Sequence, residues 1–325
     1  TALEDDLDSV KKICSNADAV IVIAGNTYLD EGEYIGDGKI RDRSNPDKAG
    51  WLVKSGRLGL GGDRKYLHLH PDDIDVIHAA SSVSKNVVVS LVVGSAVTVE
   101  EWHNEVPAII ETFYNGMEGG NALARILFGD INPSGKLPFT VPKSENDLPP
   151  FNSFDDTVHY GYYHGYTLFD KEKKESRYPF GFGLSYTKFE LSDLSCRHCD
   201  GGSATEAIPN KEIASQNFAI TTSDTIFVSV KIKNTGLRTG AEVVQLYIGF
   251  PESKIERPVK LLRGFQKIYL QPNEAREIKF IVPEKDLTYY NATSKTWKVE
   301  KGKYEVLVGN SSCDEKMQKS EFEVK

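Results

Sequence analysis

The segment between Asn26 and Gly62 combines carboxylates with aromatic rings and shows no periodicity of its own. Its acidic residues are Asp30, Glu31, Glu33, Asp37, Asp42 and Asp47, and its aromatic residues include Tyr28, Tyr34 and Trp51. Carboxylates accept hydrogen bonds from sugar hydroxyls, and aromatic faces pack against the C–H faces of sugar rings. A carbohydrate site and a solvated acidic loop are both consistent with this composition.

Other kinds of site are less well supported by residue spacing. The apolar run ending at Gly25 lacks the G-x-G-x-x-G turn of dinucleotide-binding proteins, and acidic residues repel phosphate. Ser95 lacks the second glycine of a nucleophile elbow. Cys196 and Cys199 have metal or redox spacing but no second pair, which favours a local disulfide or two free thiols. We therefore expect no metal site and no cofactor.

The apolar runs of the first half predict the elements that position the Asn26–Gly62 segment. Runs at 19–24, 86–93 and 108–113 indicate strands that are buried on both faces. Pro71, followed by two aspartates, begins a predicted helix, and a second helix covers about 121–128. Helices between buried strands predict a wound, mostly parallel α/β sheet.

Three strands are too few to cover both faces and both edges of such a sheet. The chain begins at Thr1 with a helical pattern that leads directly into the first predicted strand. We therefore expect the α/β domain to be incomplete in this chain, with its first strands supplied from elsewhere.

The second half alternates apolar and polar residues with a period of two, which is typical of half-buried antiparallel strands. Such runs occur at 226–232, 244–248, 278–282 and 304–308. About seven strands over some 140 residues indicate a β-sandwich of immunoglobulin type. The predicted domains are an α/β domain over 1–185 and an all-β domain over 186–325.

The composition is that of an acidic chain long enough for two domains. The 325 residues include 47 acidic and 39 basic side chains, for a formal charge of −8. The absence of a long basic run argues against a nucleic-acid partner, and no apolar stretch approaches the roughly 20 residues of a membrane helix. Two sequons, at Asn291 and Asn310, predict a secreted glycoprotein, with a secreted, periplasmic or lysosome- or vacuole-like location.

Several long motifs in a fixed order resemble the C-terminal part of glycoside hydrolase family 3. In the first half these are NVVVSLVVGSAVT at 86–98, VPAIIETFYNGMEGGNALARILFGDINPSGKLPFTVP at 106–142 and RYPFGFGLSYTKF at 177–189. In the second half, VKIKNTG at 230–236, GAEVVQLYI at 240–248, RPVKLLRGF at 257–265 and GKYEVLVGNSS at 302–312 resemble the fibronectin-type-III-like domain of many of these enzymes.

The resemblance implies an enzyme with three parts, of which this chain contains the last two. The first part is a (β/α)8 barrel that carries the nucleophilic aspartate. A second polypeptide, either a cleaved N-terminal portion or a separate subunit, is therefore the expected partner, and the present chain is the expected processed C-terminal subunit.

The resemblance also implies that the general acid/base is a glutamate in the loop at 29–35. Glu31 keeps the family's Glu-Gly order, whereas Glu33 keeps the spacing to Tyr34, so both are candidates and Glu31 is preferred. A retaining mechanism places this glutamate about 5 to 5.5 Å from the nucleophile. The neighbouring ionised aspartate is then expected to raise its pKa, because like charges disfavour a second ionisation.

Four further residues are candidates for substrate binding. Tyr34 and Trp51 could form walls of the leaving-group side, or could pack under the loop. Asp63 and Arg64 match a Gly-Asp-Arg-like sequence of the family, and Arg64 could touch substrate or form an ion pair that holds the end of the loop.

The resemblance therefore predicts the C-terminal chain of an exo-acting retaining β-glycosidase that acts on β-linked glycosides, with a β-glucosidase preferred. A β-xylosidase or another exo-glycosidase is the nearest alternative. A non-catalytic carbohydrate-binding or assembly module is the alternative from another functional class.

Overall fold

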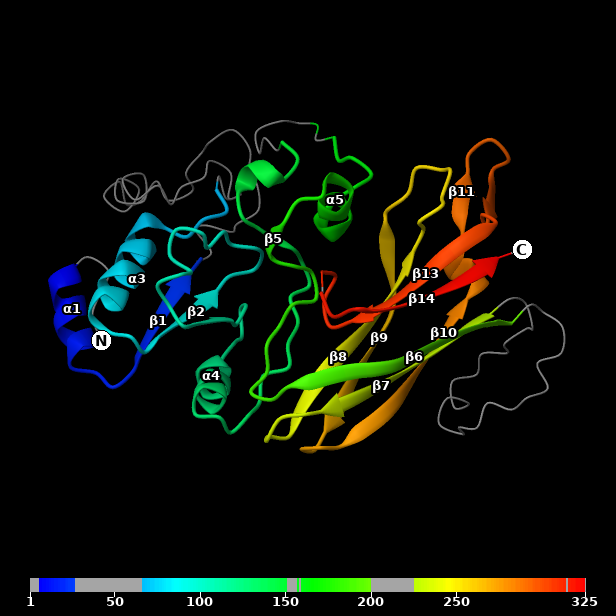
Figure 1. The fold of residues 1–325 in the computed structure, drawn as a ribbon. Helices are drawn as coiled ribbons and strands as arrows, with labels where there is room; N and C mark the ends of the chain where they lie inside the picture. Colours follow the sequence, from blue (N-terminus) through cyan, green and yellow to red (C-terminus); the bar gives the residue numbers. More distant parts are fainter. Residues whose placement is uncertain are drawn as a thin grey trace. The chain divides into compact units, whose positions relative to one another are not determined.

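The computed structural model describes residues 6–26, 66–150, 157, 159–199, 225–313 and 315–324. The chain divides into two units, and it passes between them more than once (Figure 1). The first unit comprises Thr1–Asp130, Phe139–His164 and Lys174–Tyr178, and the second comprises Ile131–Pro138, Gly165–Lys173 and Pro179–Lys325. Short stretches before residue 186 thus group with the second unit, and the division at 185/186 remains a prediction about domains.

The first unit is built on a parallel sheet of three strands in the order β1-β2-β3. The strands are β1 (Val20–Gly25), β2 (Val87–Val92) and β3 (Ala108–Glu111), which confirms the three predicted strands and their parallel arrangement. Helix α1 (Leu7–Ser15) precedes β1, and helix α3 (Pro71–Val83) connects β1 to β2 as a crossover. Proline at the start of α3 and carboxylates in its first turn suit the positive end of a helix.

One face of this sheet is packed, whereas the other face is open at β1, so the prediction of a strand buried on both faces is wrong for β1. Val22 and Ala24 of β1 lie beside Val89 and Leu91 of β2 in a buried cluster that also contains side chains of α1 and α3. The alternate residues of β1 point the other way, and Ile21 and Ile23 are 49% and 66% exposed. Among the described residues β1 is also at the end of the strand order, so it combines an edge that no described strand pairs with and an exposed apolar face.

The remaining elements of the first unit follow the sheet. Helix α4 (Gly119–Leu127) comes after β3, which confirms the second predicted helix. A short antiparallel pair, β4 (Val141–Pro142) with β5 (Ser176–Tyr178), and the 3-10 helix η1 (Glu145–Asp147) complete it. None of the helices in the described ranges is long and apolar enough to cross a membrane.

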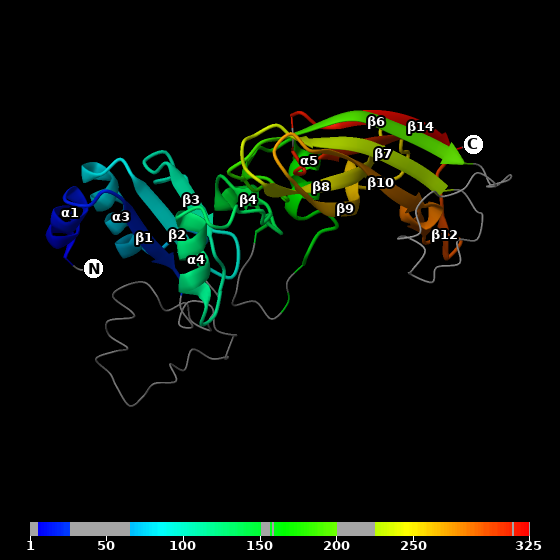
Figure 2. The same ribbon diagram turned by 90° about the horizontal axis from the view of Figure 1, so that it is seen from below.

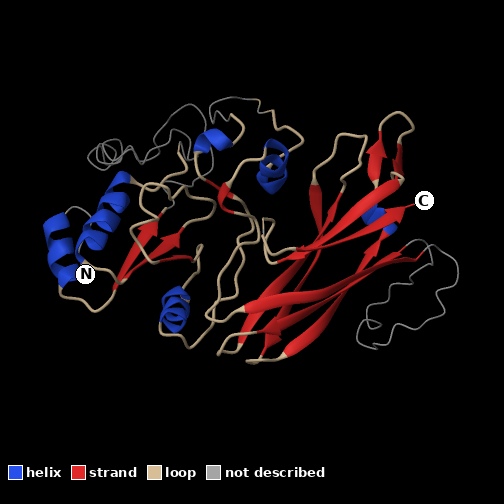
Figure 3. Cartoon of the chain, viewed as in Figure 1, coloured by secondary structure: helices blue, strands red, loops and turns tan. Residues whose placement is uncertain are grey.

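The second unit is a sandwich of two antiparallel sheets (Figure 3). One sheet has the order β10-β7-β6 and the other β14-β13-β8-β9. The strands are β6 (Phe189–Cys199), β7 (Thr225–Asn234), β8 (Gly240–Gly249), β9 (Lys260–Leu270), β10 (Ala275–Pro283), β13 (Gly302–Gly309) and β14 (Gln318–Val324). These seven strands of the described part confirm the predicted sandwich. Helix α5 (Gly165–Glu172), the 3-10 helix η3 (Glu284–Leu287) and the hairpin strands β11 (Tyr289–Asn291) and β12 (Thr296–Lys298) also belong to this unit.

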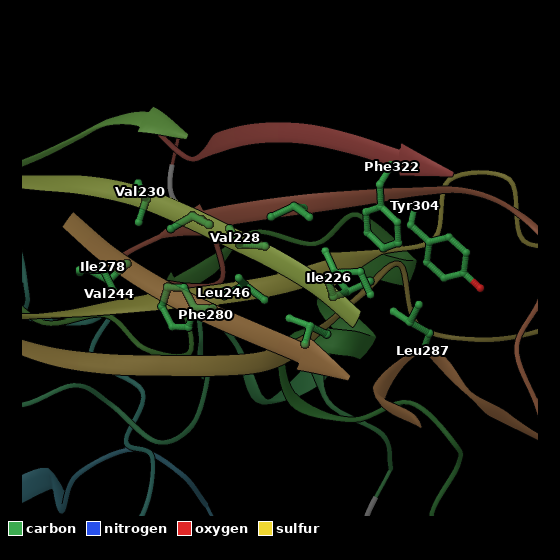
Figure 4. Close-up of a cluster of buried hydrophobic side chains, with 14 of the residues drawn as sticks. Ile226, Val228, Val230, Val244, Leu246, Ile278, Phe280, Leu287, Tyr304 and Phe322 are labelled. Carbon is green, nitrogen blue, oxygen red and sulfur yellow. The ribbon is translucent and has the colours of Figure 1, made fainter. Parts of the chain in front are cut away.

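Inward-facing residues of both sheets fill the core of the sandwich (Figure 4). Alternate residues of β7, β8, β10 and β13 contribute to it, as their period of two predicts: Ile226, Val228, Val230, Ile232, Val244, Leu246, Ile248, Ile278, Phe280, Val282, Tyr304, Val306 and Val308. The rings of Tyr304 and Phe322 stack with centroids 5.3 Å apart. This cluster gives the second unit a hydrophobic core of its own.

The outer face of β8 is also buried, because chain from before residue 186 covers it. Gln245 of β8 donates from Nε2 to the Gly181 carbonyl over 3.1 Å, and it accepts from the Tyr247 hydroxyl over 2.6 Å. Gly181 has φ +80°, and a Cβ there would lie 2.2 Å from the Gln245 side chain. Lys136 and Glu242 form a buried ion pair of 2.6 Å. We call the segments at 131–138 and 179–185 the strap.

The composition of the Gly-, Ser- and Asn-rich stretch 196–217 suggests a loose insertion, and from residue 200 on this stretch lies outside the described residues. Its first residues, Cys196 to Cys199, continue strand β6 and pair with β7. Burial raises the pKa of the Cys196 thiol to about 11, and this cysteine is a free thiol.

The buried core predicts a large difference between two leucines of the second unit. Leu246 is fully buried, whereas Leu237 is 92% exposed. We expect Leu246→Ala to lower the free energy of unfolding by about 2 to 5 kcal/mol, because it removes apolar contacts and leaves a cavity. The matched change Leu237→Ala should lower it by less than about 0.5 kcal/mol in urea unfolding. Equal losses in the two variants would contradict the assigned core.

Candidate active site

The carboxyl ends of the three parallel strands meet at one edge of the first unit's sheet. Ligands of open α/β sheets bind at this edge, because the loops that leave it converge there. After β3, the Thr112 backbone N–H and its hydroxyl both donate to the Leu91 carbonyl over 2.9 Å, which holds the chain against the end of β2. This carboxyl edge is therefore the place to look for a site.

The segment at 27–65 leaves from this edge. The Asn26 N–H donates to the Val92 carbonyl over 2.9 Å, directly after the last pair of the β1–β2 ladder. Gly25 has φ +150°, and a Cβ there would lie 2.1 Å from the Val92 carbonyl oxygen. The Gly25 N–H points to the Asp73 carboxylate at the start of α3, at 3.4 Å. Only glycine allows the chain to pass this close to the end of β2.

The chain that follows this segment, from Tyr66 on, is bonded to residues beyond β2. The Thr98 N–H donates to the Leu67 carbonyl over 2.9 Å, and His68 forms a parallel bridge with Thr98. The Leu67 N–H donates to the carboxylate of Glu145. The Tyr66 and His68 rings stack with centroids 5.0 Å apart. Both flanks of 27–65 are thus attached to chain that follows β2.

An ion pair holds the chain that receives the returning flank. Arg177 on β5 donates to both carboxylate oxygens of Glu100, from Nε over 2.5 Å and from Nη2 over 2.7 Å. The paired hydrogen bonds from Arg177 hold the pKa of Glu100 below its usual value, against a smaller opposing effect of burial. Glu100 lies two residues after Thr98, so the pair stabilises the chain at the base of the returning flank.

The six residues predicted from the sequence to act at the site lie outside the described residues. These are Glu31, Glu33, Tyr34, Trp51, Asp63 and Arg64. What the structure describes is how the chain on either side of 27–65 is held, through separate contacts of Gly25, Asp73, Thr98, Glu100, Glu145 and Arg177. Sequence analysis did not identify the anchoring roles of Glu100 and Glu145. Arg177 begins one of the family-like motifs, which is the one signal that pointed to its position.

The part of the chain that the structure describes contains no set of side chains suited to bind a metal ion. No cluster of three or more His, Cys, Asp or Glu side chains within that part could hold a metal ion. Cys14, Cys196 and Cys313 are free thiols.

Comparison with known families identifies the chain. The model of the glycosyl hydrolase family 3 C-terminal domain matches residues 2–186, which is more than half of the chain. The chain belongs to glycosyl hydrolase family 3. A fibronectin type III-like domain matches residues 242–312, within the sandwich of the second unit.

Family 3 relatives match almost the whole chain over part of their own length. Thermostable beta-glucosidase B of Acetivibrio thermocellus is 35% identical over 327 aligned residues, which cover 97% of this chain and 40% of that protein. Beta-glucosidase BoGH3A of Bacteroides ovatus is 37% identical, covering 78% of this chain and 32% of its own. The chain thus spans about two fifths or less of these relatives and corresponds to their C-terminal part.

Solved family 3 structures agree with the sequence comparison. The beta-D-glucoside glucohydrolase of Trichoderma reesei covers 99% of this chain with 42% of its own, at TM-score 0.77 and 30% identity. Beta-glucosidase 3B of Thermotoga neapolitana, solved with alpha-D-glucose, covers 98% of this chain with 39% of its own, at TM-score 0.74 and 31% identity. These matches confirm an α/β sandwich domain accompanied by a fibronectin-like domain.

The Glu100–Arg177 pair predicts a pH-dependent contribution to stability. A carboxylate whose pKa is lowered in the folded state stabilises that state above its unfolded pKa, and the contribution is lost as pH falls through the folded pKa. We expect Glu100→Gln to lower the free energy of unfolding by about 1 kcal/mol at pH 7, with the difference shrinking between about pH 5 and pH 3. Urea unfolding across this range measures it.

The matched control is the neighbouring exposed residue, in Glu101→Gln. It should change stability little at any pH. A Glu100→Gln variant that follows the wild-type stability curve over the whole range would show that the ion pair contributes nothing to this unit.

Proposed function

We propose that this chain is the C-terminal portion of an exo-acting retaining β-glycosidase, and specifically of a β-glucosidase. The observation that carries the proposal is membership of family 3 together with relatives that are named beta-glucosidases and match 97% of the chain. The chain would supply the general acid/base to a (β/α)8 barrel that carries the nucleophilic aspartate.

In the proposed reaction the barrel carboxylate attacks the anomeric carbon of a β-linked glycoside. Glu31, or alternatively Glu33, gives its proton to the leaving oxygen and later removes a proton from the water that releases the sugar. Tyr34 and Trp51 would line the leaving-group side, and Asp63 with Arg64 would bind substrate or hold the end of the loop. Support comes from the chain on either side of 27–65: the chain before it is held at the carboxyl end of β2, and the chain after it is bonded to Thr98, six residues beyond β2, and to Glu145.

The partner in this proposal is the barrel portion of the enzyme, as a processed N-terminal portion or a separate subunit. Two observations support a missing portion. The relatives are more than twice as long as the part that matches, and in the described part of the chain β1 lies at the end of the sheet with Ile21 and Ile23 exposed. Covering such a face removes apolar surface from water.

The proposal extends to location and to the nearest alternative substrate. A secreted, periplasmic or lysosome- or vacuole-like location and glycosylation are supported by the two sequons. A β-xylosidase is the alternative within the same reaction, because the contacts that select the sugar would come mainly from the barrel. Comparing hydrolysis of aryl β-glucosides with that of aryl β-xylosides by the assembled enzyme distinguishes the two.

Separate substitution of the two glutamates tests the acid/base assignment. In the enzyme assembled with its barrel portion, Glu31→Gln should lower kcat on an alkyl β-glucoside by about 10²- to 10⁴-fold, because the leaving oxygen is no longer protonated. A dinitrophenyl glucoside needs little protonation and should be affected less at the glycosylation step. Glu33→Gln serves as the matched variant. If Glu33 is the acid/base, the loss of kcat on the alkyl glucoside appears in Glu33→Gln instead of Glu31→Gln. Full alkyl glucoside turnover in both variants would refute the assignment.

Hydrogen exchange tests the proposed partner. The backbone amides of β1 should exchange more slowly when the barrel portion is present. In the proposal this portion adds strands beside β1 and covers its exposed apolar face, and both would protect the amides of β1 from exchange. The amides of β13, inside the sandwich, should exchange at the same rate in both samples. Protection of β1 that is already complete in the isolated chain would favour the non-catalytic module over the proposed enzyme.

A further inference from the structure

The two sequons of the second unit lie in opposite environments. Asn291 ends strand β11 and begins the turn of the β11–β12 hairpin, which lies at one end of the sandwich (Figures 1 and 2). Asn310 follows strand β13 and lies beside the strap that covers β8. Because both sequons belong to one unit, their exposure and their hydrogen bonds can be compared directly.

The hairpin presents the first sequon to solvent in a fixed geometry. The Asn291 side-chain oxygen accepts from the Ser294 N–H over 2.9 Å and from the Ser294 hydroxyl over 3.1 Å. Among the described residues, Nδ2 of Asn291 takes part in no hydrogen bond. All four turn residues, 292–295, are exposed, including Thr293, which supplies the sequon hydroxyl. A large polar group on Nδ2 would therefore extend into water without displacing a packed side chain.

The second sequon is tied into the folded unit by its backbone and its serines. The Asn310 carbonyl accepts from Gln245 Nε2 over 2.7 Å, and Gln245 is itself only 3% exposed. The Ser312 N–H donates to the Phe180 carbonyl over 2.8 Å. Ser311 and Ser312 are 4% and 3% exposed, so the sequon hydroxyl is inside the fold. A glycan placed here before folding would compete with the hydrogen bonds to the strap, at the cost of buried polar groups left unpaired.

We propose that Asn291 is an N-glycosylation site of this protein and that Asn310 is not. In the reaction, Asn291 Nδ2 bonds to the anomeric carbon of an oligosaccharide carried on a lipid pyrophosphate. The bond from that carbon to the phosphate oxygen breaks, the lipid pyrophosphate leaves with the electron pair, and Nδ2 loses one proton to a base of the transferase. No oxidant or reductant is needed, and the inference rests on the secreted location proposed above, not on the proposed glycosidase activity.

Site mapping by mass spectrometry tests the inference on the full chain. The chain is secreted from a eukaryotic host behind an added signal peptide, together with a reporter glycoprotein that proves the transferase active. Peptide N-glycosidase in heavy-oxygen water converts each glycosylated asparagine to labelled aspartate, and trypsin releases the two sequons on separate peptides, 286–295 and 304–316. We expect the label on the first peptide and an unmodified second peptide.

Variants separate the sequon from the structure around it. An attached glycan also shifts the mobility of the chain in gel electrophoresis. Asn291→Gln and Thr293→Ala should each abolish this mobility shift, and Thr293→Ala does so while Asn291 keeps its contacts with Ser294. Asn310→Gln should leave the shift intact. Label on peptide 304–316 of the secreted chain, or an unmodified Asn291 beside a fully glycosylated reporter, would overturn the inference. Retention of turnover in the assembled enzyme has no bearing on either result.

Discussion

The parallel pairing of β1 with β2 is the constraint on which the candidate site depends. It aligns Gly25 with Val92, and the missing side chain at Gly25 lets the chain cross the end of β2 within hydrogen-bonding distance. From there the segment at 27–65 begins, and the chain that follows it bonds through Leu67 to Thr98, six residues after β2. Neither flank could be where it is if the β1–β2 register moved by one residue, because every side chain of β1 would exchange faces.

Charged side chains, rather than apolar packing, hold the irregular segments that follow β1 and β2. Glu145 accepts from the Leu67 backbone, and Arg177 holds Glu100 with two hydrogen bonds. Irregular segments have few apolar contacts, so their backbone groups and charges must find partners elsewhere. These contacts hold the returning flank and the chain beside it through polar groups.

The two units show different degrees of completeness. The sandwich has a closed core and a strap on its outer face, where Gln245 bonds to Gly181 and Asn310. In the α/β unit one face of β1 is packed, whereas Ile23 on its other face is exposed, and none of the strands in the described ranges pairs with the outer edge of β1. Since exposed apolar strand edges invite pairing, the second strand partner of β1 is the natural contribution of the proposed barrel portion.

Local sequence patterns determined most of the elements of this protein. The apolar runs gave the three parallel strands, the period of two gave the sandwich strands, and Pro71 marked the start of α3, because periodicity reports which face of an element is buried. The long motifs determined the family.

Only the tertiary structure decided which distant residues meet. Glu100 and Arg177 are 77 residues apart, Leu67 and Glu145 are 78 apart, and Gln245 reaches Asn310 across 65. The path of the chain sets these contacts, and no pattern within a short window carries that information. The same holds for the sequons: identical in kind as tripeptides, they differ because one ends on an exposed turn and the other is bonded to a strap that folds back from elsewhere in the chain.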